Sequence, residues 1–208
     1  MRNARGAGLK KLILYIHGKG GSHREAERYK QNCREFDIAG VEYNDYLPWI
    51  VQSRIQAAYD KARENYDSIS IIANSIGAYF AMHSLQNCEL KKALFISPVL
   101  DMERLILDMM SRAHVSESDL CVRGEIATDF GETLSWNYLR FVREHPITWS
   151  VPTEILYAGS DSLVSRQTVD AFVSSHNARL TVMEDGEHWF HTDEQLAFLD
   201  SWMKEAIG

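Results

Sequence analysis

Short apolar runs alternate along this chain with segments whose apolar residues recur at helical spacing. The runs are short and continuous, which is typical of strands buried on both faces of a sheet. We expect strands over residues 12–16, 36–43, 69–73, 92–97, 153–158 and 179–183. Helical patterns separate most of them, and this alternation predicts a parallel sheet with helices on both faces.

Several helices can be bounded from the sequence. A polar helix is expected after Ser22, and further helices are expected over residues 165–176 and 192–206. Pro48, at a favourable first helical position, opens a helix that runs to about Tyr66. Its buried stripe is expected to consist of Ile50, Ile55, Ala58 and Ala62.

The alternation breaks from Asp101 to about Pro146. One helical patch starts this insertion, and a second is expected from Thr133 to about Glu144, ended by a His-Pro pair. Four aromatic residues could line an acyl or aromatic pocket, or could simply pack the insertion onto the sheet. They are Phe130, Trp136, Tyr138 and Trp149.

The stretch from Ser68 to Leu85 turns from a strand into a helix almost without a loop. Small residues, Ala73 and Gly77, stand two positions before and after Ser75. Such an abrupt turn holds a serine hydroxyl out at the top of a sheet, although serine is also a common helix N-cap. The stretch resembles the G-x-S-x-G elbow of the α/β-hydrolase family, with alanine in place of the first glycine.

Two later turns resemble the same family. Asp161 lies in Gly-Ser-Asp-Ser-Leu-Val after one predicted strand, and His188 lies in Gly-Glu-His after the last. The chain order of serine, acid and histidine is that of α/β-hydrolases. The resemblance implies a catalytic triad in which His188 is the base for Ser75 and Asp161 orients His188. Asp101, after the preceding strand, is an alternative acid.

The turn His-Gly-Lys-Gly-Gly after the first strand resembles the oxyanion turn of that family. The resemblance implies backbone N–H donors at Lys19 and at Ile76, and a turn-stabilising role for His17. The glycines could instead serve only a tight turn. The spacing matches neither nucleotide-binding glycine motif, so a phosphate site is not favoured.

The resemblance covers residues from about 11 to 205. It implies one α/β-hydrolase domain over 1–208, a three-layer fold with a minimal, mostly parallel six-stranded sheet, and a helical cap-like insertion at about 101–146. Residues 1–10 are too few for the two antiparallel strands with which larger members begin.

Composition limits the remaining functions. The formal net charge of −7 argues against a nucleic-acid surface. The three cysteines, Cys33, Cys88 and Cys121, have no metal-ligand spacing, so reduced thiols are expected. A metal site of His188, His191 and Asp193 is conceivable but lacks further ligands. We expect no metal or organic cofactor.

No apolar stretch is long enough for a signal-peptide core or a membrane span, so we expect a cytoplasmic protein. The expected reaction is cleavage of an ester or thioester of a small or medium acyl substrate through an acyl-serine. A peptidase, an amidase, an acyltransferase and a non-catalytic binding protein remain alternatives. The sequence leaves the substrate and the oligomeric state open.

Overall fold

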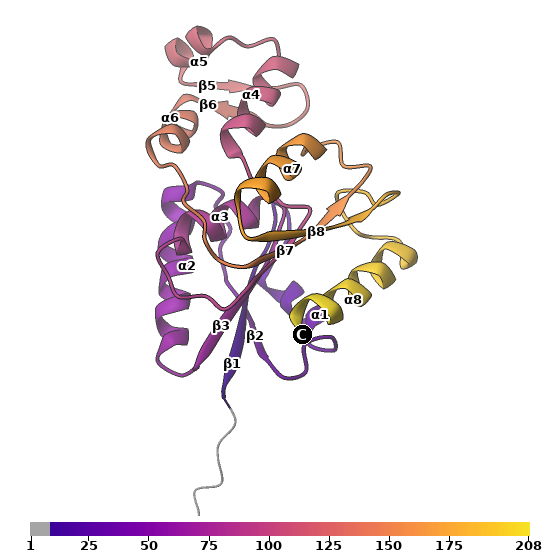
Figure 1. Ribbon diagram of the computed structural model, residues 1–208. Coiled ribbons are helices and arrows are strands. Elements are labelled where there is room, and N and C mark those ends of the chain that lie inside the picture. The colour runs from indigo at the N-terminus through magenta and orange to yellow at the C-terminus, as the bar shows by residue number, and fades with distance from the viewer. Residues whose placement is uncertain (1–8) are drawn as a thin grey trace, which may run out of the picture.

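The computed structural model describes residues 9–208, so most of the segment 1–10 considered above lies outside the described residues. Six parallel strands form the main sheet in the order β2-β1-β3-β4-β7-β8 (Figure 1). They are β1 (Lys11–Ile16), β2 (Asp37–Gly40), β3 (Ser68–Asn74), β4 (Ala93–Ile96), β7 (Thr153–Ala158) and β8 (Ala178–Met183). The predicted six-stranded sheet is confirmed, although β2 is shorter than expected.

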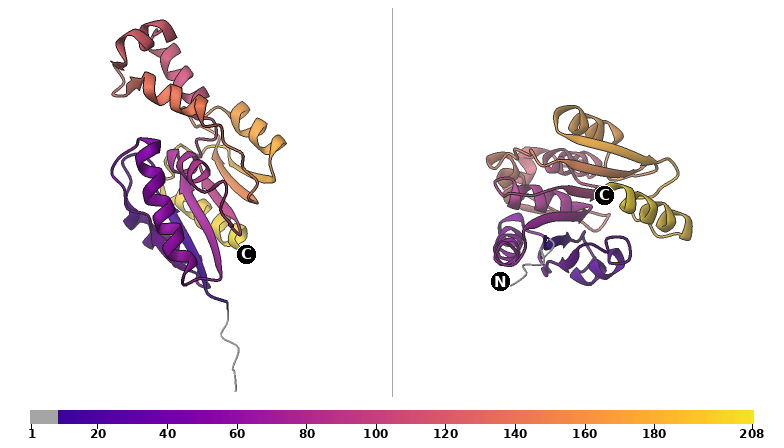
Figure 2. Two further views of the ribbon diagram at one scale, coloured as in Figure 1. Left: turned by 90° about the vertical axis from the view of Figure 1, so that its left-hand side faces the viewer. Right: turned by 60° about the horizontal axis from the view of Figure 1, so that its bottom comes forward.

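Helices cover both faces of this sheet (Figure 2). The core of one face includes buried residues of α2 (Pro48–Arg63), α3 (Ile76–Leu85) and α7 (Arg166–Ser175). The core of the other includes residues of α1 (Ala26–Tyr29) and α8 (Asp193–Ile207). The polar helix expected after Ser22 is reduced to a 3₁₀ turn, His23–Glu25, followed by the short α1.

The buried stripe of α2 differs from the prediction at two positions. The buried residues are Pro48, Val51, Ile55, Tyr59 and Ala62, whereas Ile50 is 38% exposed and Ala58 is only partly buried. Positions 51, 55, 59 and 62 repeat at intervals of four and three, so they lie on one helix face. Ile50 lies five positions before Ile55 and therefore points elsewhere.

The segment between β4 and β7 projects from the main sheet (Figure 1). It contains α4 (Met102–Arg112), α5 (Glu117–Arg123) and α6 (Trp136–Glu144). An antiparallel hairpin, β5 (Glu125–Ala127) and β6 (Thr133–Ser135), joins α5 to α6. The prediction of helix from Thr133 is therefore wrong: Thr133–Ser135 pairs with β5, and the helix begins at Trp136, with the Ser135 hydroxyl accepting from the Tyr138 N–H.

The strand order reverses between β1 and β3. From β1 the chain passes to β2 at one edge, and from β3 it passes towards β4 on the other side. In an open parallel sheet, the loops that follow two such strands separate and leave a crevice at their carboxyl ends. Here these loops carry residues 17–22 and 75–77, which include the predicted elbow and oxyanion turn.

Candidate active site

Ser75 stands alone between β3 and α3 in an unusual backbone conformation. Its φ of 53° and ψ of −124° lie outside the regions that most L-residues occupy. Its N–H donates to Ile96 O and its carbonyl accepts from Val99 N, both at 3.0 Å. The turn is thus fixed to β4 and to the segment just after it, and the Ser75 side chain is held out from the sheet.

Gly77 permits the close approach of α3 to the end of β1. A Cβ at this position would lie 2.5 Å from Ile16 O and 2.6 Å from His17 O, and both of these atoms belong to the backbone. Side chains larger than hydrogen are therefore excluded unless the helix moves away. Ala73, the small residue on the other side of Ser75, is fully buried within β3.

The structure brings Ser75, His188 and Asp161 together. Ser75 Oγ lies 2.8 Å from His188 Nε2, and His188 Nδ1 lies 2.7 Å from Asp161 Oδ2. A carboxylate oxygen can only accept, so Nδ1–H donates to Asp161 and leaves Nε2 to accept from the serine hydroxyl. His188 is 8% exposed and the Asp161 side chain is fully buried. This arrangement can take a proton from Ser75.

Asp161 is fixed by its own loop. Its second oxygen, Oδ1, accepts from Leu163 N at 2.7 Å and from Val164 N at 3.1 Å. Asp101, the alternative acid, instead caps α4, where its Oδ1 accepts from Arg104 N at 2.9 Å. The structure therefore places Asp161, and not Asp101, against His188.

The two predicted oxyanion donors lie on loops that meet at the crevice. Ile76 is the first residue of α3, so its N–H has no acceptor within the helix. Lys19 lies in the loop after β1, where the N–H groups of the next two residues are used elsewhere. Gly18 packs against the elbow so closely that a Cβ there would lie 3.2 Å from both Asn74 O and Ser75 Cβ.

His17 lies beneath this loop, 1% exposed and stacked on Tyr43 with the ring centroids 4.0 Å apart. Its Nδ1 lies 2.9 Å from Gly18 O, and its Nε2 lies 3.1 Å from Tyr43 O. The Tyr43 hydroxyl donates to His17 O at 2.5 Å. These contacts fix the start of the turn, and the hydrogen bonds of the His17 ring go to Gly18 and Tyr43 rather than to Ser75 or Asp161.

A cavity of about 480 Å³ opens beside Ser75. Its lining combines the loop 18–21 with apolar residues of α1, α8 and the segment after His188, including Tyr29, Leu199 and Phe190. Trp189 also lines it and is 69% exposed. The volume lies in the range of small-molecule sites in proteins.

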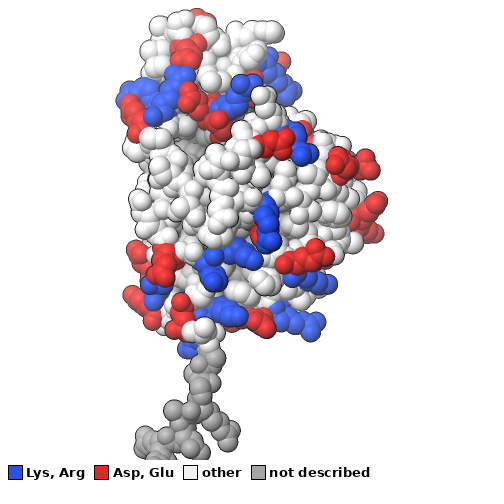
Figure 3. Space-filling model, viewed as in Figure 1, with Lys and Arg blue, Asp and Glu red and all other residues white. Residues whose placement is uncertain are grey.

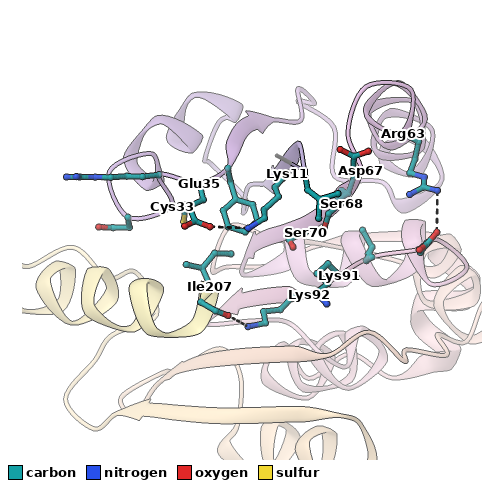
Figure 4. A pocket seen from close by; sticks show the side chains of 18 residues that line it. Lys11, Cys33, Glu35, Arg63, Asp67, Ser68, Ser70, Lys91, Lys92 and Ile207 are labelled. Atoms are coloured by element: carbon teal, nitrogen blue, oxygen red, sulfur yellow. Dashed lines mark hydrogen bonds and ion pairs between the residues drawn. The ribbon is translucent and has the colours of Figure 1, made fainter. Parts of the chain in front are cut away.

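A larger cavity of about 740 Å³ lies at the opposite edge of the sheet, at the amino ends of β1, β3 and β4 (Figure 4). Two ion pairs lie among its charged groups: Lys11 with Glu35 at 3.0 Å, and Arg63 with Glu89 at 3.3 Å. None of the three residues of the predicted triad lines it. Of the residues in the predicted triad, Ser75 lines the smaller cavity.

The remaining candidates do not join the site. Trp149 is buried beside β4 and β7, stacked on Phe95, and its indole N–H donates to Thr153. His191 has a 57% exposed side chain whose Nδ1 lies 2.7 Å from Trp189 O. Across residues 9–208, His, Cys, Asp and Glu side chains form no group of three that could hold a metal ion.

Two groups near the site were missed at the level of sequence. Tyr46 Oη accepts from Gly20 N at 2.9 Å, and Glu25 Oε1 accepts from Ser22 N at 2.9 Å. The spacing Ser22-x-x-Glu25 is a capping-box signature, so the second contact had a signal in the sequence. Tyr46 lies 26 residues beyond Gly20, and no local pattern indicates that contact.

A profile of the family described as uncharacterised protein family UPF0227 matches residues 12–197, which is most of the chain. The chain belongs to this family. The match includes Ser75, Asp161 and His188. No curated protein matched the chain.

Solved structures show the same fold. Est1E from Butyrivibrio proteoclasticus superimposes with a TM-score of 0.75 at 17% identity, over 97% of this chain and 88% of Est1E. Mouse alpha/beta hydrolase domain-containing protein 10 gives 0.73 at 12% identity, over 94% and 89%. A lipase-esterase related protein from Clostridium acetobutylicum gives 0.64 at 12% identity, over 95% and 94%. This member of the UPF0227 family therefore has the α/β-hydrolase fold.

Charged side chains of both signs lie close together on the surface. On the face shown in Figure 3, basic and acidic side chains lie next to one another over both the sheet region and the projecting segment. In that segment Arg143 pairs with Glu103 and Glu117, each at 2.7 Å.

Among the helices of the described chain, none combines the length and the apolar character needed to cross a bilayer.

Proposed function

We propose that this protein is a serine hydrolase that cleaves an ester or thioester of a small or medium acyl substrate. The observation that carries the proposal is the continuous contact from Ser75 Oγ through His188 to the buried Asp161 carboxylate. A lone serine is a weak nucleophile at neutral pH, and a base held within hydrogen-bonding distance activates it. The fold shared with Est1E, one structure of which contains ferulic acid, is consistent with this proposal.

In the proposed reaction, Ser75 Oγ attacks the acyl carbonyl while His188 Nε2 takes the serine proton. Asp161 keeps Nδ1 protonated and stabilises the imidazolium that forms. The N–H groups of Lys19 and Ile76 donate to the oxyanion, and they need no reorganisation because the backbone fixes them. His188 then gives its proton to the leaving alcohol or thiol. In the second half of the reaction water attacks the acyl-serine, His188 takes the proton of that water, and the proton passes to Ser75 Oγ as the acid product leaves.

The same three residues would also serve a peptidase, an amidase or an acyltransferase. The site does not separate these reactions, because they share the attack on a carbonyl. The intact contacts of Ser75 argue against a binding protein that keeps only the scaffold. No step of the proposed reaction calls for a metal or an organic cofactor.

We also assign residues 101–146 to a cap within a single hydrolase domain. The supporting contact is an ion pair at 2.5 Å between Lys19 Nζ, on the oxyanion loop, and Glu132, next to the turn of the β5–β6 hairpin. It connects positions 113 residues apart and places the hairpin next to the loop that carries a proposed donor.

Labelling with a fluorophosphonate probe tests the proposal, since the probe reacts with a serine activated by its base and oxyanion donors. We expect one label on wild type, mapped to Ser75, and none on Ser75→Ala. His188→Ala should also abolish labelling. The matched control is His191→Ala, three residues away on an exposed side chain, which should label at the wild-type rate.

A panel of p-nitrophenyl esters, acyl thioesters and anilides then distinguishes the reaction classes on the same variants. We expect turnover of esters and thioesters that disappears with Ser75→Ala. Folded wild-type protein that neither takes the label nor cleaves any member of the panel would refute the hydrolase proposal. Faster cleavage of anilides than of matched esters would assign an amidase instead.

A further inference from the structure

The loop that carries the Lys19 amide has few fixed points. Within it, Gly21 N donates to Gly18 O at 3.1 Å, which closes the turn itself. Gly20 N donates to Tyr46 Oη at 2.9 Å on one side. On the other side, Ser22 N donates to Glu25 Oε1 at 2.9 Å. Glu25 and Tyr46 are therefore the side chains that accept from the backbone N–H groups of Ser22 and Gly20.

Glu25 also contacts the sheet beneath the loop. Its second oxygen, Oε2, accepts from Tyr15 Oη at 2.5 Å. Tyr15 lies on β1, is fully buried, and has its pKa raised by burial, by Tyr29 and by Glu25 itself. The hydroxyl therefore remains protonated at neutral pH and can always donate to the carboxylate.

The strand that carries this tyrosine pairs with the strand that leads into the nucleophile elbow. In the pairing of β1 with β3, Tyr15 lies opposite Ile72 and the next residue, Ile16, lies opposite Ala73. Asn74 is the last residue of β3 and directly precedes Ser75. Hydrogen bonds thus run from Ser22 N through Glu25 to Tyr15, and the pairing of β1 with β3 connects Tyr15 to the strand that ends just before Ser75.

These hydrogen bonds and the β1–β3 pairing together connect the two halves of the proposed oxyanion site. At one end Glu25 holds the loop with the Lys19 amide, and at the other end β3, paired with the strand of Tyr15, leads into Ser75 and Ile76. Glu25 and Asn74 both line the cavity of about 480 Å³ beside Ser75, so the contacts lie at the site. Glu25 packs under the loop as well, since a Cβ at Gly21 would meet its Oε1 at 2.8 Å.

We propose that Glu25 and Tyr15 are positioning residues that set the distance between the Lys19 amide and the nucleophile elbow. The inference rests on the proposed hydrolase function and adds two residues to its site. Neither side chain needs to touch the substrate. Their role is to keep the Lys19 N–H where the oxyanion develops, a position on which the benefit of such a donor depends.

The proposal predicts an effect on kcat rather than on KM. Loss of one oxyanion donor costs about 10²–10³-fold in kcat, and a displaced donor should cost less, about tenfold. We therefore expect Glu25→Ala to lower kcat about tenfold, with KM within about twofold of wild type, because the displaced donor matters mainly in the transition state. Glu25→Gln keeps an acceptor for Ser22 N and an NH₂ donor for Tyr15 Oη, so it should recover part of the loss.

Tyr15→Phe removes the hydrogen bond between Glu25 and the sheet and keeps the buried ring. The double variant Glu25→Ala/Tyr15→Phe should be no slower than the worse single variant, because both changes release one connection. Multiplicative effects of the two changes would contradict a shared role. All rates are divided by the number of sites titrated with the fluorophosphonate, so unfolded protein does not count as lost kcat.

The matched control lies on the same helical segment. Glu27 pairs with Lys30 at 2.7 Å on the surface and does not line the cavity. Glu27→Ala removes a carboxylate of the same kind from a neighbouring position and should leave kcat and KM unchanged. An equal loss of kcat in both variants would indicate that the segment, and not the Glu25 contact, determines the rate.

Hydrogen exchange of the amides of residues 18–22 tests the same contacts without any substrate. We expect faster exchange at Ser22 and its neighbours in Glu25→Ala and Tyr15→Phe, and wild-type exchange in Glu27→Ala. Unchanged exchange in the first two variants overturns the proposal. If wild type takes no fluorophosphonate label while the variants show the expected exchange, the hydrolase proposal is refuted and the structural link between Glu25, Tyr15 and the loop stands.

Discussion

The backbone conformation of Ser75 makes a quantitative prediction about stability. A residue held at φ 53° and ψ −124° stores strain of about 1–3 kcal/mol unless it is glycine. Ser75→Gly and Ser75→Ala both remove the hydroxyl and its contact with His188, but only the glycine variant releases the strain. Glycine loses about 0.5–1 kcal/mol relative to alanine through the entropy of the unfolded chain. With the middle of each range, about 2 less about 0.75 kcal/mol, Ser75→Gly should be more stable than Ser75→Ala by about 1–2 kcal/mol.

Urea unfolding and thermal melting measure this difference directly. For a chain of this size, about 1–2 kcal/mol corresponds to a melting temperature between about 2 and 8 °C higher for the glycine variant. Both variants should be inactive and unlabelled, so the comparison is independent of catalysis.

Two control positions separate strain from other effects of glycine. Ser53, exposed within α2, has helical surroundings, and there the glycine variant should be less stable than the alanine variant by about 1 kcal/mol. Ser165 caps α7 at φ −70° and measures the ordinary advantage of glycine over alanine at an N-cap. A glycine advantage at Ser75 no larger than that at Ser165 would refute the strain argument.

Three further predictions follow from other contacts of the site and its surroundings. Asp161→Asn should lower kcat about 10⁴-fold through loss of the correct imidazole tautomer. Asp101→Ala should keep kcat and lose only about 1 kcal/mol of stability, because it removes a helix cap. Activity assays and urea unfolding of both variants decide which aspartate is the acid. Glu132→Gln should speed hydrogen exchange in residues 128–132 at low salt, because the ion pair with Lys19 is lost. The difference from wild type should vanish near 1 M salt, where charges are screened within about 3 Å. Persistence of the difference at high salt would exclude an ionic cause. Burial, and to a lesser extent the neighbouring His145, lowers the pKa of the His83 imidazole in the folded protein. The unfolded chain therefore binds more protons, and the free energy of unfolding should fall as pH drops through about 6.5. Unfolding curves of His83→Phe should show a weaker pH dependence, and an unchanged pH dependence would count against His83 as its origin.

The elements that could be predicted from the sequence are those with strong local signals. The strands are short apolar runs, and the turns around Ser75, Asp161 and His188 carry glycine and polar residues directly after such runs. Because these turns all follow parallel strands, their side chains meet at one edge of the sheet. That is why three residues far apart in the chain could be proposed as one site before their distances were known.

Other parts of the structure leave weaker signals. The hairpin β5–β6 has three residues in each strand, too few for an alternating pattern to stand out from the helix that follows. Ile50 and Val51 are similar residues, and only the packing of α2 decides which is buried. The contacts of Glu132 with Lys19 and of Glu25 with Tyr15 depend on how the folded elements lie together, and charge alone does not identify such partners.

The position of β8 at the edge of the sheet has a consequence for the order in which the protein matures. Strands β1, β3 and β4, together with the strained turn at Ser75, have all been synthesised by residue 96, less than halfway along the chain. His188 follows β8, which pairs only with β7 and is the last strand to leave the ribosome. The nascent chain therefore carries Ser75, the proposed nucleophile, long before His188, the proposed base, and the proposed reaction has to wait until the final quarter of the chain has folded onto the sheet.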